Sequence, residues 1–178
     1  MSNELDPMAL RRAYAAYATG VAVVGTHAHD GKPVGMTVNS FTSVSLSPPL
    51  ISFCPAHSCV AFPVYCAMTH FSVNVLTDEQ RHISDRFARS GAESKWSDLS
   101  YYLGEHGVPV INGALASFEC LVHSRVEAGD HAIVLGRVLK IHGPSDAEPL
   151  LFHASRYRKI GPAEGHAPGD IVLLGWGL

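Results

Sequence analysis

The sequence lacks the features of several large classes of protein. It has no apolar run near the roughly 20 residues of a membrane-spanning helix, and its N-terminus, MSNELDPMAL, has neither a basic region nor an apolar signal core. Its 178 residues carry a formal net charge of −3 and only 13 Lys and Arg, too few cations for a nucleic-acid backbone. We therefore expect a single cytoplasmic domain with no membrane or nucleic-acid partner.

Motifs for metals and for the common nucleotide folds are also missing. The four cysteines form no CxxC pair, so no disulfide framework is predicted for an unsecreted chain. None of the eleven histidines belongs to an HExxH or a zinc-type Cys/His spacing, and we expect no metal. There is no Rossmann GxGxxG and no P-loop GxxxxGK[ST]. Any nucleotide must therefore be held in another way.

The chain opens with a helical pattern. Asp6 can cap a helix that has Pro7 at its first position. This helix is expected to bear Tyr14 and Tyr17 on its apolar face and to end before Gly20.

Beyond this helix the pattern predicts mostly strands. Helices are predicted over residues 58–67 and 79–88, capped by Ser58 and Asp78, and residues 89–107 are expected to be irregular with one helical turn. The predicted strands are residues 21–26, 33–38, 41–46, 50–54, 70–76, 114–126, 131–141 and 150–153, the two long ones joined by a four-residue link. Since βαβ alternation is absent, we expect a closed or nearly closed antiparallel barrel with its ligand site at the rim or a subunit interface.

The most informative segment is residues 35–50, GMTVNSFTSVSLSPPL, which places hydroxyl and amide groups within a predicted buried strand. Apolar Phe41, Val44 and Leu46 are expected to face the core. The polar side chains between and before them must be solvated, bonded within the chain, or in contact with a ligand, and the residues alone leave all three open. The helix start at Ser58 suits a phosphate, but a simple capped helix explains it as well.

Two further groups of residues have chemical potential. Gly129-Asp130-His131 lies between the two long strands, where acid beside histidine could relay a proton, bind a substrate amide, or form only a turn. Cys59 lies at the predicted helix start, where a thiolate is stabilised, with His57 as the nearest base. No GxSxG elbow or cysteine-protease signature supports thiol catalysis.

Five motifs together resemble the flavin reductase-like family, the small NAD(P)H:flavin oxidoreductases of two-component flavin monooxygenases. They are ATGVAVV at 18–24, GMTVNSFTSVSLSPPL at 35–50, FSVNVL at 71–76, GDH at 129–131 and PLLFHASRY at 149–157. The resemblance covers about residues 5–160 and implies a mainly β fold with peripheral helices, an antiparallel Greek-key split β-barrel that binds FMN. It assigns residues 1–161 to this domain and leaves 162–178 as a tail, whose apolar part could dock on a dimer partner.

The resemblance also implies the chemistry. A homodimer would hold FMN or FAD near the subunit interface, take hydride from NADH or NADPH, and pass reduced flavin to an oxygenase component by diffusion. Flavin contacts are implied at Gly35, Met36, Thr37, Asn39 and Ser40, at the backbone of Ser43 and Val44, and at Cys54, Pro55, Ala56, Ser58, Arg86 and Phe87. His131 would contact and orient the nicotinamide, with Phe152, His153, Ser155 and Arg156 closing over the dinucleotide.

The sequence leaves the flavin, the nicotinamide and the acceptor open. Relatives carry Ser-Arg-Ser or Ser-x-Thr after the Cys-Pro loop where this chain reads HSCVAF, so the choice between FMN and FAD is undecided. No cationic cluster for a 2′-phosphate is evident, which favours NADH, although Arg156, Arg158 and Lys159 lie close to the dinucleotide segment. Two alternatives are a flavin-binding electron-transfer module without rapid NADH turnover, and a flavoenzyme that reduces a corrinoid or a metal chelate.

Overall fold

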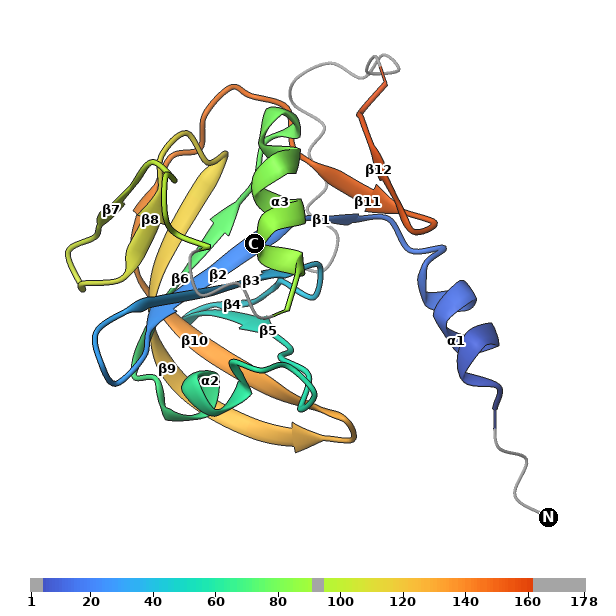
Figure 1. Cartoon of the computed structure of the whole chain (residues 1–178), viewed down its shortest axis with the longest axis horizontal. Helices are drawn as coiled ribbons and strands as arrows, with labels where there is room; N and C mark the ends of the chain where they lie inside the picture. The colour runs from blue at the N-terminus through green and yellow to red at the C-terminus, as the bar shows by residue number, and fades with distance from the viewer. Residues whose placement is uncertain (1–4, 91–94, 162–178) are drawn as a thin grey trace.

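A seven-stranded antiparallel sheet forms the centre of the computed structural model, which describes residues 5–90 and 95–161. Its strand order is β3-β2-β6-β9-β10-β5-β4, and it curls so that β3 and β4 are its two edges (Figure 1). The strands are β2 (Ala22–His27), β3 (Pro33–Val38), β4 (Thr42–Leu46), β5 (Pro49–Phe53), β6 (His70–Val75), β9 (Ala116–Ala128) and β10 (His131–His142). The mainly β, antiparallel architecture expected from the sequence is confirmed.

Two small sheets flank the main one. β1 (Thr19–Gly20) pairs with β11 (Leu151–His153), which pairs with β12 (Arg156–Arg158), a strand that the sequence pattern did not predict. β7 (Tyr101–Leu103) and β8 (Pro109–Ile111) form a hairpin within and just after the segment expected to be irregular, so that prediction was wrong. The short strands escape sequence patterns because three residues show no periodicity.

The helices lie outside the sheet. They are α1 (Pro7–Tyr14), α2 (Phe62–Ala67) and α3 (Arg81–Ala88), the last preceded by the 3₁₀ turn η1 (Asp78–Gln80). The Asp6 cap is confirmed, because its carboxylate accepts hydrogen bonds from the N–H groups of Met8 and Ala9 at 3.0 and 3.2 Å. Within residues 5–90 and 95–161 no helix is long and apolar enough to cross a membrane.

The other two predicted caps were wrong. Ser58 lies in a turn closed by the bond from Cys59 N–H to Ala56 O at 3.0 Å, and α2 begins only at Phe62. Neither Ser58 nor Cys59 therefore lies at a helix N-terminus, which removes the local reason for a phosphate or a thiolate there. Thr77, one residue before Asp78, is the N-cap of η1, and its N–H donates to Gln80 Oε1 at 3.2 Å.

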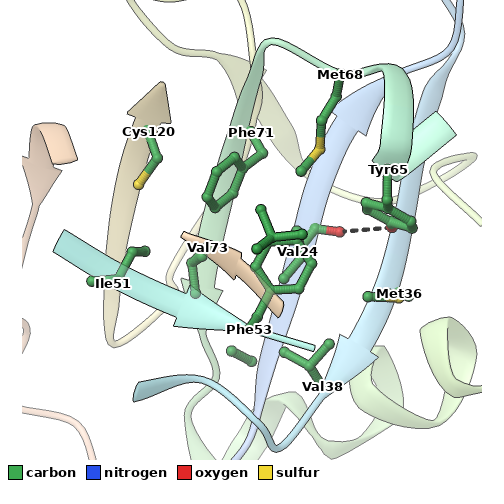
Figure 2. Close-up of a cluster of buried hydrophobic side chains, with 12 residues drawn as sticks. Val24, Met36, Val38, Ile51, Phe53, Tyr65, Met68, Phe71, Val73 and Cys120 are labelled. Carbon is green, nitrogen blue, oxygen red and sulfur yellow. Dashed lines mark hydrogen bonds between the residues drawn. The ribbon is translucent and has the colours of Figure 1, made fainter. Parts of the chain in front are cut away.

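Large apolar side chains fill the interior of the curled sheet (Figure 2). Phe53 and Phe71 lie with ring centroids 5.2 Å apart, and the Tyr65 hydroxyl donates to Val24 O at 3.3 Å. A Cβ on Gly136 of β10 would lie 2.3 Å from the Phe71 ring, and the β9–β10 register shifts at this point. Glycine therefore lets β10 bend over Phe71, as a bulge does in a curved sheet.

A second cluster packs α3 against the sheet. Ile83 and Phe87 are both buried, as predicted from the helix pattern. Thr37 Oγ1 donates to Ser84 O at 2.7 Å, and a Cβ on Gly35 would lie 2.6 Å from the Phe87 ring. Since Thr37 meets Ser84 while Gly35 meets Phe87, α3 runs antiparallel to β3 and ends beside the β2–β3 turn.

The edge strand β4 differs from expectation. Val44 is 44% exposed and Leu46 69% exposed, so the prediction that they face the core was wrong; only Phe41 is partly buried, 5.7 Å from the Phe118 ring. β4 pairs on one side alone, and the register shift between Ser43 and Ser45 leaves Val44 in a bulge. An alternation of apolar and polar residues predicts a buried face only where a second layer of structure covers the strand.

The link between the long strands is shorter than predicted. Ala128 pairs with His131, so Gly129 and Asp130 alone form the turn, with Gly129 at φ +68°. A positive φ at the first turn position matches the right-handed twist of a hairpin and favours glycine.

Glu119 on β9 fastens the β7–β8 hairpin to the barrel. Its side chain is fully buried and accepts hydrogen bonds from the N–H groups of Glu105 and His106, and its two oxygens lie 3.0 Å from His106 Nδ1 and 2.7 Å from His142 Nε2. Burial raises the pKa of this carboxyl, but the hydrogen bonds outweigh it and the net pKa is lowered. The charged form therefore stabilises the fold.

Glu119→Gln is expected to lower the free energy of unfolding by about 2–4 kcal/mol near neutral pH, because buried donors lose a charged acceptor. Since the folded pKa is lowered, this contribution is present above the unfolded pKa of about 4.3 and is lost as pH falls through the folded value. Urea unfolding at several pH values measures it. Glu105→Gln, at an exposed carboxylate paired with Lys140, is the control and should change little; an equal loss in both variants contradicts the assignment.

Candidate functional site

A cavity of about 950 Å³ runs along the whole of β3, from the β2–β3 turn to the residues that follow the strand. One side is β3 and α3, and the other is the loop between β5 and α2 with His131. Lining residues that the sequence singled out are Gly35, Met36, Thr37, Asn39, Ser40, Cys54, Ala56, Ser58, Phe87 and His131. The cavity thus brings together residues from four separate parts of the chain.

The polar side chains of the hydroxyl-rich segment, residues 35–50, have three different environments. Thr37 bonds to Ser84 O, and Ser40 Oγ accepts the N–H of Cys54 at 3.0 Å, so both also hold the walls together. Asn39 lines the cavity, while Thr42 and Ser43 on β4 are exposed. Two of the alternatives left open by the sequence, bonding within the chain and exposure to solvent, therefore each apply to part of the segment, and ligand contact at Asn39 stays a prediction.

The opposite wall is tied to the β9–β10 turn. His57 N–H donates to Asp130 O at 2.9 Å and Ala132 N–H donates to Pro55 O at 3.0 Å. His57 Nε2 lies 3.0 Å from the Glu127 carboxylate, and its ring packs on Phe62. Among residues 5–90 and 95–161, the partners of His57 are Asp130, Glu127 and Phe62 and do not include Cys59, so the structure gives no support to a Cys-His dyad.

His131 enters the cavity beside this wall, and its orientation is fixed by its neighbour. His131 Nδ1 lies 2.7 Å from Asp130 Oδ1, and this hydrogen bond lowers the pKa of the Asp130 carboxyl. With Nδ1 bonded to a carboxylate, Nε2 is the ring nitrogen that can meet a ligand.

The end of the cavity at the β2–β3 turn is cationic. Lys32, Arg89 and Lys95 all line it, with one acid, Asp30, paired with Lys32 at 3.0 Å. Lys95 Nζ donates to Phe87 O at 3.3 Å at the C-terminus of α3, and burial lowers its pKa, with Cys59 acting in the opposite direction. Sequence reasoning missed Lys95; its one signal is a lysine beside a tryptophan in an otherwise polar segment.

Arg86 stabilises the cationic end of the cavity without lining it. Its guanidinium donates to the carbonyl oxygens of Ser97 at 2.8 Å and Lys95 at 3.4 Å, and it does not reach the cavity wall. It therefore fixes the segment that carries Lys95 and Trp96.

Trp96 forms an aromatic floor. It is only 6% exposed, packs edge-on against Phe87 and Tyr101, and lines the cavity. Its buried indole Nε1–H has no hydrogen-bond partner among residues 5–90 and 95–161. A buried donor without a partner is rare and marks a place where a further group can bind.

Other residues predicted from the resemblance lie elsewhere. Phe152 lines a second cavity, between α1 and the residues that follow β3. The remaining ones line neither cavity and stay predictions: Ser43, Val44, Pro55, Arg86, His153, Ser155 and Arg156. In the part of the chain that the structure describes, no three His, Cys, Asp or Glu side chains converge as metal ligands do.

This arrangement suits an elongated ligand with a planar ring and an anionic end. Aromatic and methionine side chains with a few polar groups bind rings, while a cationic end binds phosphate.

Comparison with known proteins identifies the family of the chain. A sequence model described as "Flavin reductase like domain" matches residues 14–161. The chain is 43% identical over 150 residues to an FMN reductase (NADH) of Agrobacterium fabrum, covering 84% of each protein. It is 37% identical over 164 residues to the reductase subunit of a flavin-dependent monooxygenase of Mycobacterium tuberculosis, covering 91% of this chain and 87% of that protein.

Solved structures show the same fold. The NADH:FAD oxidoreductase of Streptomyces globisporus, in complex with NAD and FAD fragments, matches with a TM-score of 0.83 and 38% identity over 90% of this chain and 98% of that one. The antiparallel split barrel expected from the sequence is therefore confirmed. The chain belongs to the flavin reductase-like family.

Proposed function

We propose that this protein is an NAD(P)H:flavin oxidoreductase that transfers hydride from NADH to FMN or FAD and supplies reduced flavin to a partner monooxygenase. The cavity along β3 is the main support for this proposal, because aromatic side chains, polar side chains and a cationic end all line the same groove. Family membership and relatives that reduce FMN or bind FAD support it.

The residues present fit a flavin. Trp96 and Phe87 give an apolar floor, Asn39 and Ser40 offer amide and hydroxyl groups at one end, and Lys95 offers an ammonium at the other. The flavin supplies the redox chemistry by accepting hydride at its ring, so the protein has to position two rings and exclude competing reactions.

His131 acts in positioning. Asp130 holds Nδ1, which leaves Nε2 to hydrogen-bond the nicotinamide amide and set its distance from the flavin ring. This role needs no change of protonation during hydride transfer, and it agrees with the exposed position of the pair at a hairpin turn.

We further propose a homodimer. Exposed apolar side chains occur at Val44 and Leu46 on β4 and at Leu139 and Ile141 on β10, two strands that β5 separates. β4 also presents the open edge of the sheet, which proteins normally cover. Covering β4 with a second copy would place Ser43 and Val44 at an interface near Asn39 and Ser40, where the resemblance puts flavin contacts.

The proposed partner is an oxygenase component that receives reduced flavin by diffusion, as the monooxygenase subunit name of one relative suggests. The proposed compartment is the cytoplasm. All four cysteines are free, as is usual where thiols are kept reduced.

A steady-state matrix tests the function. NADH and NADPH, each combined with FMN, FAD and riboflavin, are expected to give rapid nicotinamide oxidation that depends on added flavin, with NADH preferred. The loss of nicotinamide absorbance is measured. Flavin that stays bound through gel filtration, with negligible NADH oxidation, would instead identify an electron-transfer module; turnover with a corrinoid or a metal chelate but not with free flavin would identify the other alternative.

Lys95→Met is expected to raise the Kd of FMN about tenfold, because one charge-assisted contact to the phosphate is lost. Riboflavin, which lacks the phosphate, should bind both proteins equally. Fluorescence titration measures both affinities. Lys159→Met, at an exposed lysine paired with Asp78 outside the cavity, is the matched control. Equal weakening of FMN and riboflavin would show a structural role for Lys95 instead.

His131→Ala is expected to raise the KM for NADH and to lower kcat, because the nicotinamide loses its orienting contact. The pH dependence of kcat should keep its shape, since His131 does not transfer a proton. His123→Ala, at an exposed histidine of the same hairpin, is the control. Unchanged kcat and KM in His131→Ala would refute the assignment.

A further inference from the structure

The tip of the β9–β10 hairpin, which carries His131, extends beyond the rest of the main sheet. The pairing of β9 with β6 ends at Leu121, and the register of β5 with β10 starts only at Val134. Residues 123–133 thus form a two-stranded ribbon, and such a ribbon has little stability of its own. A fixed position of the His131 ring therefore depends on further contacts at this tip.

The loop between β5 and α2, residues 54–58, makes these contacts with its backbone. Ala56 and His131 form an isolated antiparallel bridge. Two hydrogen bonds flank the bridge, from His57 N–H to Asp130 O at 2.9 Å and from Ala132 N–H to Pro55 O at 3.0 Å. Since the bonds come from neighbours of the bridged pair, its two side chains lie close together on one face. Ala56 and His131 both line the cavity, so this face is part of the cavity wall.

The side chain of His57 makes a second set of contacts outside the cavity. Unlike Ala56 before it, His57 does not line the cavity. Its Nε2 lies 3.0 Å from the Glu127 carboxylate, and its ring packs edge-on against Phe62, the first residue of α2, with ring centroids 4.7 Å apart. Glu127 lies directly opposite Ala132 in the β9–β10 register. His57 therefore contacts β9 through its ring and the β9–β10 turn through its N–H.

The His57–Glu127 pair is too exposed to contribute much to the stability of the fold. The side chain of His57 is 39% exposed and that of Glu127 is 75% exposed, and ion pairs in water stabilise proteins little. The pair lies beside the Asp130–His131 pair. The pKa of the Asp130 carboxyl is lowered first by its hydrogen bond with His131, and His57 acts in the same direction. His57 is thus close enough to act on the group that orients His131.

We propose that His57 and Glu127 are positioning residues for His131, an inference that rests on the proposed function. Their contact fixes the hairpin tip against the 54–58 loop. Because that loop and the His131 ring line the same cavity, the contact sets the distance from this ring to a flavin bound there.

The flavin side of the cavity has its own supports. Cys54 N–H donates to Ser40 Oγ at 3.0 Å, and Cys59 N–H donates to Ala56 O at 3.0 Å. Neither bond involves His57 or Glu127. Loss of their contact should therefore weaken nicotinamide binding and leave flavin binding unchanged.

Amide hydrogen exchange, followed residue by residue by NMR, tests the contact without flavin or turnover. In His57→Ala the Ala132 amide is expected to exchange about threefold faster, because an exposed contact that holds its acceptor loop is lost. Glu127→Ala breaks the pair from the other side and should give the same increase. His57→Gln keeps an N–H donor near the carboxylate and should restore most of the protection. Amides in the centre of β6 report global stability and should not change.

Steady-state kinetics at saturating FMN test the role of the contact. His57→Ala is expected to raise the KM for NADH about threefold and to lower kcat less than His131→Ala does, with the Kd of FMN unchanged. In a His131→Ala background, His57→Ala should add nothing, because it acts through His131. His57→Gln should behave as wild type. His82→Ala, at an exposed histidine of α3 that lines neither cavity, is the matched control.

Calorimetric titration of NAD⁺ needs no turnover, and its Kd should also rise about threefold in His57→Ala. If wild type fails to oxidise NADH while this rise and the faster Ala132 exchange are seen, the proposed function fails and the positioning role stands. Rapid wild-type turnover with unchanged Ala132 exchange in His57→Ala and Glu127→Ala overturns the positioning role alone. Additive effects of His57→Ala and His131→Ala, an equal loss of FMN affinity, or the same loss in His57→Gln would each overturn it too.

Discussion

The packing of α3 against β3 is the contact on which the rest of the site depends. A side chain at Gly35 would meet Phe87 and Trp96, so the absence of a Cβ sets the distance between helix and strand. The hydrogen bond from Thr37 to Ser84 O fixes their relative position along the axis. This packing places the C-terminus of α3, and with it Lys95, at one end of the groove and leaves Asn39 at the other.

Elements with a long, regular pattern were predictable from the sequence. The β2–β3 hairpin, the pairing of β9 with β10, the Asp6 cap and the buried face of α3 follow from periodicity and turn chemistry. The exposure of Val44 and Leu46 was not predictable, because it depends on β4 being an edge strand without a second layer. Lys95 was missed for a related reason, since its position depends on Arg86 holding the chain after α3.

The split barrel has an apolar interior and two cavities at its periphery. Its interior is a rigid apolar core around Phe53 and Phe71 (Figure 2), which no ligand needs to enter. The core residues Met36 and Val38 also line the first cavity, which lies where an edge strand, turns and a helix meet. Asn39 and Ser40 line both cavities, so one short stretch of the chain forms part of each wall. The hydroxyl-rich segment, residues 35–50, is therefore a strand only in part, and its Asn39 and Ser40 lie between the two cavities.

The central claim is that the groove along β3 holds a flavin with its phosphate at the cationic end. A crystal structure of the FMN complex tests it most directly. The account predicts the ring system over Phe87 and Trp96 near Asn39, with a phosphate oxygen within hydrogen-bond distance of Lys95 Nζ. A phosphate beside Asn39 and Ser40, or a flavin bound outside this groove, would contradict the account.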